Sequence, residues 1–159
     1  MPMRVRKRYG IKEKRFRRVT EALTDTFGMS PEGTKFEVAE TDGPEVYLVD
    51  GVPVALDTGD GLFPALAGIL RFPPSRRYVT VDMGAVAFLA NGANVMAPGI
   101  VEADPAIREG DAVWVREETH GRPLCVGRAL RNGPDMVRGK GVAVETVHYV
   151  GDRLWRVFG

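Results

Sequence analysis

The chain has 159 residues, of which 44% are hydrophobic, and its 22 Lys or Arg nearly balance 21 Asp or Glu. This is enough apolar material for one sizeable core or two small ones, since domains of about 100 residues are common. No apolar run reaches the roughly 20 residues of a membrane span, and the basic N-terminus lacks the apolar stretch of a signal peptide. We therefore expect a cytoplasmic protein with no membrane partner. The single cysteine excludes an internal disulfide and a multi-cysteine zinc site.

The charges are unevenly distributed along the chain. Residues 1–18 contain nine Lys or Arg and one acid, Glu13, whereas the remaining 141 residues contain thirteen basic and twenty acidic side chains. A concentrated basic segment attracts polyanions locally even where the net charge is close to zero. The N-terminus is therefore a candidate polyanion-binding segment, and the alternative is a solvated helix face that serves solubility.

The basic segment comprises an arm at residues 1–10 and the start of a predicted helix over residues 11–27. Phe16, Val19, Leu23 and Phe27 recur at three- and four-residue steps, which is typical of one buried helix face. Basic residues occupy the other sides of this helix: Lys12, Lys14, Arg15, Arg17 and Arg18. Gly28 fits the C-cap position that ends it.

An antiparallel meander is expected to follow the helix. Short Val-rich runs at residues 35–39, 45–49 and 52–56 predict three strands, and Asp50-Gly51 between the last two is a strong hairpin signal. A short helix over residues 65–70 ends this module. Two prolines then impose an extended path at residues 72–77, so we place a domain boundary there, with domains at residues 1–75 and 76–159.

The second domain predicts a small barrel. Its expected strands are residues 78–82, 113–115, 124–130, 142–148 and 154–158, with a helix over residues 84–90. In that helix we expect Ala85, Phe88 and Leu89 to face inward. Asn91-Gly92 ends it, so the fold class is α+β.

No catalytic or metal-binding constellation is recognisable. Asp57-Thr58-Gly59 superficially resembles an aspartic-protease loop, but that site needs two carboxylates, and a turn is the better interpretation. Cys125 alternates with small residues as in a buried strand, and His148 stands at a strand end, where a hydrogen-bonded imidazole is usual. His120 completes the imidazoles, and two histidines with scattered acids have no metal-ligand spacing. We expect neither a metal nor a cofactor.

Residues 81–100, VDMGAVAFLANGANVMAPGI, resemble the opening of a PUA domain. Gly110-Asp111, Cys125-Val126-Gly127, Gly139-Lys140-Gly141 and Val147-His148-Tyr149 follow in that domain's order, so the resemblance covers residues 78–157. Asp60-Gly61-Leu62-Phe63-Pro64 and the segment His148–Trp155 extend it. The chain thereby resembles the malignant-T-cell-amplified-sequence family of translation proteins, in an archaeal-like form, and that family carries a pre-PUA domain ahead of the PUA.

The resemblance implies a pre-PUA α/β-meander domain followed by a PUA pseudobarrel of about six strands. It also implies a non-catalytic RNA-binding protein that recognises rRNA or the tRNA acceptor region, on or near the small ribosomal subunit, beside a translation-factor partner. The implied RNA-facing residues are Gly84, Asn91, Gly92, Ala93, Asn94, Pro98 and Gly99, bordered by Gly139, Lys140 and Gly141. Gly92 has a physical reason as well, because a residue without Cβ permits positive φ and close approach of RNA; the alternative is a helix C-cap.

Arginines extend the expected RNA-binding surface. Arg128 and Arg131 in the second domain, and Arg15, Arg17 and Arg18 on the first helix, are suited to phosphate contacts. Two alternatives stay open. One is an accessory subunit or remnant of an RNA-modifying enzyme, of the pseudouridine synthase or tRNA-guanine transglycosylase type. The other is a protein adaptor with an apolar patch at Phe63, Phe72 and Trp155, although core packing suits all three aromatics.

Overall fold

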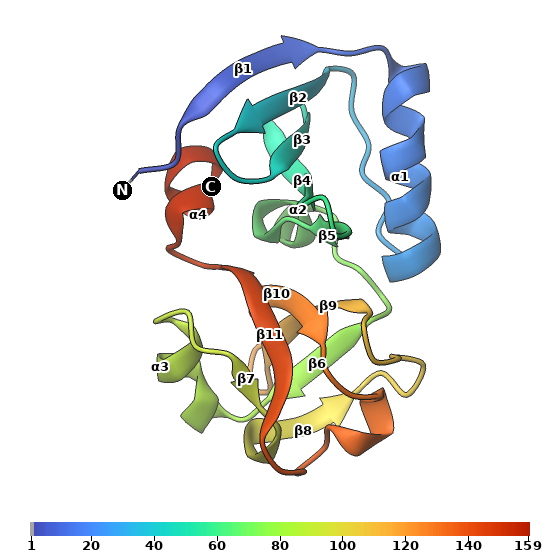
Figure 1. Cartoon of the computed structure of the whole chain (residues 1–159). Coiled ribbons are helices and arrows are strands. Elements are labelled where there is room, and N and C mark those ends of the chain that lie inside the picture. The colour runs from blue at the N-terminus through green and yellow to red at the C-terminus, as the bar shows by residue number, and fades with distance from the viewer. Residues whose placement is uncertain (1) are drawn as a thin grey trace. The chain divides into compact units, whose positions relative to one another are not determined.

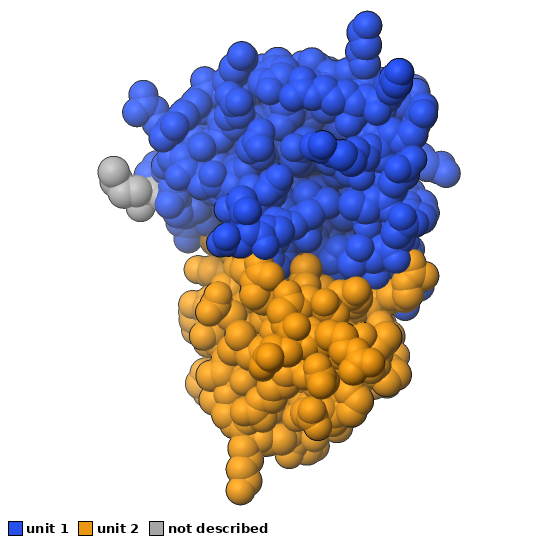
Figure 2. Space-filling view, turned by 45° about the vertical axis from the view of Figure 1, so that its right-hand side comes forward, with its two compact units in different colours: residues 1–75, 153–159 blue, residues 76–152 orange. Residues whose placement is uncertain are grey.

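The computed structural model describes residues 2–159 (Figure 1). Contacts along the chain divide it into two compact units, shown in Figure 2. The first runs up to Ser75 and also includes Arg153–Gly159, and the second is Arg76–Asp152. None of the helices in this described part is long and apolar enough to cross a membrane.

The first unit contains a five-stranded antiparallel sheet. Its strands pair in chain order: β1 (Val5–Gly10), β2 (Phe36–Thr41), β3 (Glu45–Val49), β4 (Val52–Asp57) and β5 (Leu62–Pro64). The expected meander is confirmed, but residues 5–10 form a strand where we expected an arm. A strand at the edge of a sheet tolerates charged side chains because they stay in water, so β1 needs no apolar alternation.

Helix α1 (Glu13–Phe27) packs its predicted apolar face against this sheet. Phe16, Val19, Leu23 and Phe27 are buried, as their spacing predicted. The ring centroid of Phe16 lies 5.0 Å from that of Phe36 and 5.9 Å from that of Tyr47, so the helix packs on β2 and β3. Gly28 ends the helix in the left-handed conformation, which confirms the predicted cap. Helix α2 (Leu66–Arg71) follows β5.

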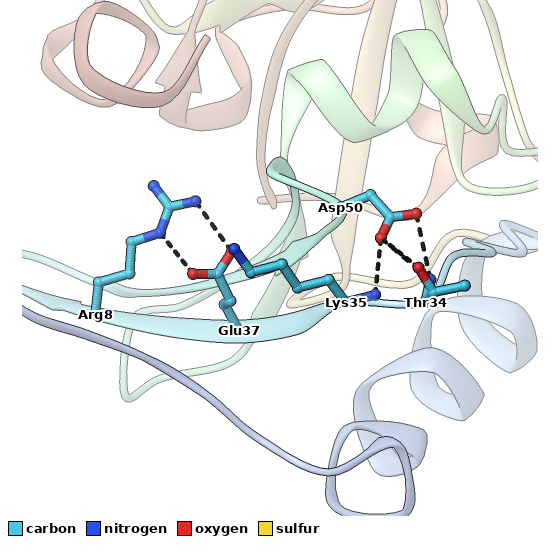
Figure 3. A network of polar contacts seen from close by, with 5 residues as sticks. All are labelled: Arg8, Thr34, Lys35, Glu37 and Asp50. Carbon is cyan, nitrogen blue, oxygen red and sulfur yellow. Dashed lines mark hydrogen bonds and ion pairs between the residues drawn. The ribbon is translucent and has the colours of Figure 1, made fainter.

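Two polar contacts fix the edges of the meander (Figure 3). Asp50, in the predicted hairpin turn, accepts hydrogen bonds from the backbone N–H groups of Thr34 and Lys35 at 3.1 and 2.7 Å. The Nε and Nη2 atoms of Arg8 donate to the two carboxylate oxygens of Glu37 at 3.0 and 3.1 Å, which joins β1 to β2. This bidentate pairing uses the side of the guanidinium that fits a carboxylate or phosphate.

The second unit is a curled, mixed six-stranded sheet, which confirms the expected pseudobarrel. The strands, in sheet order, are β7 (Val95–Met96), β11 (Val142–Tyr149), β10 (Pro123–Ala129), β9 (Ala112–Glu117), β6 (Tyr78–Val81) and β8 (Ile100–Ala103). Only the β6–β9 pairing is parallel among those described. The core between them includes Val79, Val81, Ile100, Val115 and Val144.

Short helical turns connect the strands of the second unit. The 3₁₀ turn η1 (Met83–Ala85) leads into α3 (Val86–Leu89), η2 (Ala97–Gly99) separates β7 from β8, and η3 (Gly133–Asp135) follows β10. The expected helix over residues 84–90 is therefore a 3₁₀ turn followed by a single α-helical turn.

The C-terminal segment corrects another prediction. Residues 154–158 were expected to form a strand of the barrel, but Arg153–Phe158 is helix α4, and it clusters with the first unit. Leu154 is its one buried residue among those described, and Arg153 pairs with Asp42 of the β2–β3 turn at 2.9 Å. A short apolar run carries no periodicity that separates strand from helix, so these tertiary contacts decide the outcome.

Candidate nucleic-acid interface

An open pocket of about 500 Å³ lies beside α3 in the second unit. The segment that enters α3, α3 itself, the loop after it, η2 and the start of β11 form the wall. The lining residues are Asp82, Gly84, Ala85, Phe88, Leu89, Ala93, Asn94, Met96, Pro98, Gly99 and Val142. Five of the residues expected to face RNA are in this wall: Gly84, Ala93, Asn94, Pro98 and Gly99.

The pocket is mostly apolar and displays an exposed aromatic ring. Phe88 is 68% exposed and Met96 is 49% exposed. The prediction that Phe88 faces inward is wrong, because α3 is a single turn and buries only Leu89 among its residues. A solvent-exposed ring in an apolar hollow is a surface on which a nucleobase can stack. No periodicity in the sequence marks Phe88 as exposed, since a four-residue helix is too short to define a face.

Gly92 is explained by the fold itself. Its φ is 83°, its N–H donates to the carbonyl of Leu89 at 3.0 Å, and it ends α3. A Cβ at this position would lie 2.7 Å from Cε1 of Tyr149. The C-cap alternative therefore accounts for the glycine without any RNA. The neighbouring Asn91 donates its side-chain amide to the carbonyl of Ala87 at 3.1 Å and does not line the pocket.

The Gly139-Lys140-Gly141 turn borders the pocket through its backbone. The carbonyl of Gly141 accepts a hydrogen bond from Ala97 of η2 at 2.8 Å, and Val142 enters the pocket wall. The guanidinium of Arg131 lies close to this turn: a Cβ built on Gly141 would be 2.9 Å from its Nη2. Lys140 is exposed.

The other predicted arginine of this unit points elsewhere. Arg128, on β10, donates from Nη1 to the carbonyl of Gly110 at 2.9 Å and is outside the pocket lining. Sequence reasoning did not single out Asp82, which lines the pocket and pairs with Arg138 at 2.9 Å. Its position as the residue before η1, where an Asp side chain caps backbone N–H groups, is the signal that was available.

The first unit carries a separate cationic surface on α1. Lys12, Lys14, Arg15, Arg17 and Arg18 are all exposed, and none of them forms an ion pair with another described residue. They cluster at the N-terminal end of α1, whereas its last turn has no basic residue. Cations at this end oppose the helix macrodipole, so the arrangement does not serve helix stability.

The residues considered for catalysis occupy structural positions. Cys125 is fully buried, and burial raises the pKa of its thiol to about 12, which disfavours a thiolate nucleophile. The buried ring of His148 contacts Asp152 through Nδ1 at 2.8 Å, and Asp57 accepts the N–H of Gly59 within a turn. Within residues 2–159 no group of three or more His, Cys, Asp or Glu is placed to hold a metal ion. Phe63, weighed as an adaptor residue, is in the core.

Comparison with known proteins assigns both halves of the chain. Residues 77–150 match the PUA domain family, and residues 7–72 match a domain of unknown function (DUF1947). The solved structure of a conserved PUA domain protein from Thermoplasma acidophilum superposes with a TM-score of 0.85 at 32% identity. It covers 96% of this chain and 100% of that one.

Relatives cover both units. An uncharacterized protein of Methanocaldococcus jannaschii is 43% identical over 99% of this chain and 100% of its own length. Translation machinery-associated protein 20 of Saccharomyces cerevisiae is 33% identical over 72% of this chain and 67% of its own length. Malignant T-cell-amplified sequence 1-B of Xenopus laevis is 31% identical over 71% and 65%. The chain belongs to the PUA-domain family that includes translation machinery-associated protein 20 and the malignant T-cell-amplified sequence proteins.

Proposed function

We propose that this chain is a non-catalytic, cytoplasmic RNA-binding protein of the translation machinery. It recognises structured RNA, either rRNA or the acceptor region of tRNA, on or near the small ribosomal subunit, and works beside a partner translation factor. One named relative, protein 20 of Saccharomyces cerevisiae, is described as translation machinery-associated, which supports the setting. The observation that carries RNA binding is the open apolar pocket with Phe88 exposed in it.

The pocket suits an unpaired nucleobase. Its volume of about 500 Å³ exceeds that of a single base, its wall is largely apolar, and the Phe88 ring offers a stacking partner. Sequence-tolerant stacking contributes ~1–3 kcal/mol per base in proteins that bind single strands. A helical stem with a single-stranded end, which is the form of a tRNA acceptor, presents such a base next to a duplex.

The cationic surface on α1 supplies the second part of the proposal. Five exposed basic residues without ion-pair partners in the described chain are free to displace counterions from an RNA backbone. This contribution is independent of base sequence, so it adds affinity while the pocket selects the RNA form. The accessory-subunit alternative has no observation in its favour.

The test compares two RNA hairpins that share a stem. One ends in four unpaired 3′ nucleotides and the other is blunt, and both are titrated at low ionic strength by fluorescence anisotropy. We expect tighter binding of the hairpin with the unpaired end. Phe88→Ala should weaken that binding by about 5- to 150-fold, which corresponds to the loss of one stacked base. Because Phe88 is exposed, the variant should stay folded.

Leu130→Ala is the matched control, since Leu130 is an exposed aliphatic residue of the same unit outside the pocket lining. It should bind both hairpins as the wild type does. Sedimentation with small ribosomal subunits and with tRNA then identifies the natural RNA. Failure of the wild-type protein to bind any of these RNAs at low ionic strength would overturn the proposal.

A further inference from the structure

Arg138 and Asp82 form an ion pair at the pocket wall. Nη1 of Arg138 donates to Oδ2 of Asp82 at 2.9 Å and to the carbonyl oxygen of Pro98 at 2.6 Å. Asp82 and Pro98 both line the pocket, so the guanidinium lies against that wall. Its side chain is nevertheless 56% exposed, which leaves it open to a ligand.

Only one corner of this guanidinium is occupied. Both hydrogen bonds use Nη1, and within residues 2–159 its Nε and Nη2 have no partner. Nε and Nη2 form the side of the guanidinium that binds an oxyanion in bidentate fashion. Arg8 uses that same side on Glu37 in the first unit (Figure 3). In Arg138 this side meets no acceptor within residues 2–159.

The backbone of Arg138 is held in an unfavourable conformation. Its φ is 50°, a left-handed value that a residue with a Cβ adopts at a cost in free energy. Its N–H donates to the carbonyl of Ile100 at 3.0 Å, which fixes the conformation. The two Nη1 contacts orient the guanidinium before any ligand arrives. Such pre-organisation strengthens binding because less freedom is lost in the complex.

The negative charge of Asp82 is unexpected in a pocket that binds a polyanion. Asp82 is the one charged residue among the described residues that line the pocket, and its charge repels phosphate unless it is neutralised. The pair with Arg138 neutralises it. Oδ1 of Asp82 also accepts the N–H of Ala85 at 3.2 Å, so the carboxylate is itself fixed by η1.

We infer that Arg138 binds a phosphate of the RNA strand that leads into the pocket, through Nε and Nη2. Asp82 is a positioning residue that holds Arg138 through Nη1. This inference rests on the proposed function and adds the phosphate contact to it. The pocket and Arg138 thereby bind a base and its adjoining phosphate together, which favours a single-stranded nucleotide over a duplex end.

The first experiment measures binding of the hairpin with the unpaired 3′ end across a salt series. Arg138→Ala should weaken binding about tenfold and lower the slope of log affinity against log salt by about 0.7–0.9, as loss of one phosphate contact requires. Arg138→Lys should keep the slope but not the full affinity, because lysine cannot bind in bidentate fashion. Arg108→Ala, an exposed arginine outside the pocket lining, is the control and should change neither.

The second experiment separates positioning from a merely structural role of Asp82. Asp82→Asn keeps an oxygen for the N–H of Ala85, so η1 should persist. In the wild-type background it should weaken binding about threefold or more, and in the Arg138→Ala background it should not weaken binding at all, because Asp82 acts through Arg138. An equal loss in both backgrounds would overturn the positioning role.

A chemical change in the RNA tests the same contact from the other side. Neutral methylphosphonate linkages are placed one at a time in the unpaired 3′ end. One of them should weaken binding to the wild type and have no effect on Arg138→Ala. If the wild type binds the hairpin while Arg138→Ala keeps its affinity and salt slope, this inference alone is overturned; if the wild type binds no RNA, the proposed function falls as well.

Discussion

Alanine substitution should distinguish two kinds of glycine around the pocket. Gly92 has a φ of 83°, and its Cβ would lie 2.7 Å from the ring of Tyr149. The left-handed backbone costs an alanine ~1–2 kcal/mol, and displacement of the ring adds ~1 kcal/mol. We expect Gly92→Ala to lower the free energy of unfolding by ~2–3 kcal/mol and the Tm by roughly 10–20 °C in a unit of this size.

Gly99 should behave in the opposite way. Its φ is outside the left-handed region, and a Cβ would meet Cβ of Ala85 at 3.4 Å and Oδ1 of Asp82 at 3.9 Å, both on the pocket wall. Because alanine restricts the unfolded chain, the stability should be unchanged or rise by ~0.4–1 kcal/mol. The added methyl group narrows the pocket, so binding of RNA with an unpaired 3′ end should weaken about tenfold.

Thermal unfolding by circular dichroism and anisotropy titration measure the two effects independently. A Gly99→Ala protein that binds this RNA as tightly as the wild type would refute the assignment of the pocket as the contact surface. A Gly92→Ala protein with an unchanged Tm would refute the explanation of Gly92 by Tyr149 and the helix end. Wild-type RNA affinity in Gly99→Ala together with a wild-type Tm in Gly92→Ala would refute both explanations.

Three further predictions concern charge and burial. Glutamate at the three α1 arginines, Arg15, Arg17 and Arg18, should weaken RNA binding and lower the slope of log affinity against log salt by about 0.7–0.9 per residue. An unchanged slope would mean that this helix face serves solubility only. The hydrogen bond from its arginine partner holds the pKa of Glu37 below the usual value. Its stabilising effect is thus present above the unfolded pKa of about 4.3 and is lost as the pH falls through the lower folded pKa. Glu37→Gln should therefore cost ~1 kcal/mol at pH 7 and less in acid, as urea titrations at both pH values will measure. Cys125, with a pKa raised to about 12, should resist iodoacetamide at pH 8 until urea unfolds the chain, as mass spectrometry will record.

Local chemistry made much of the first unit predictable. The four buried residues of α1 recur at helical spacing, Gly28 ends the helix, and Asp50-Gly51 is a turn signal that lies between the paired strands β3 and β4. Strand β1 was not predictable in this way. Three of its six residues are charged, and it is a strand because β2 offers an edge and Glu37 a partner for Arg8.

Several short elements could not be predicted from the sequence for a related reason. Strands β7 and β8 have two and four residues, which is too few for alternation to be recognised, and α4 is a helix that buries one described residue. The resemblance to the PUA domain located the loop around residues 91–99. It could not show that Phe88 is exposed, nor that Asp82 and Arg138 meet across 56 residues of sequence, because both facts depend on how the barrel closes.

The glycines show what a structure adds to a motif. By sequence, Gly84, Gly92, Gly99 and Gly139 are equivalent members of one glycine-rich surface. Their contacts in the structure separate them into two groups. Gly92 needs positive φ, and a Cβ at Gly139 would lie 2.8 Å from the carbonyl oxygen of Asp135, so the fold itself requires both. At Gly84 and Gly99 the nearest atoms are side-chain atoms 3.3 and 3.4 Å away, so the fold can accept alanine at both with small adjustments. Both line the pocket, and the absence of a side chain there keeps it open. The glycines that the fold does not require are therefore the ones to which a binding role can be assigned.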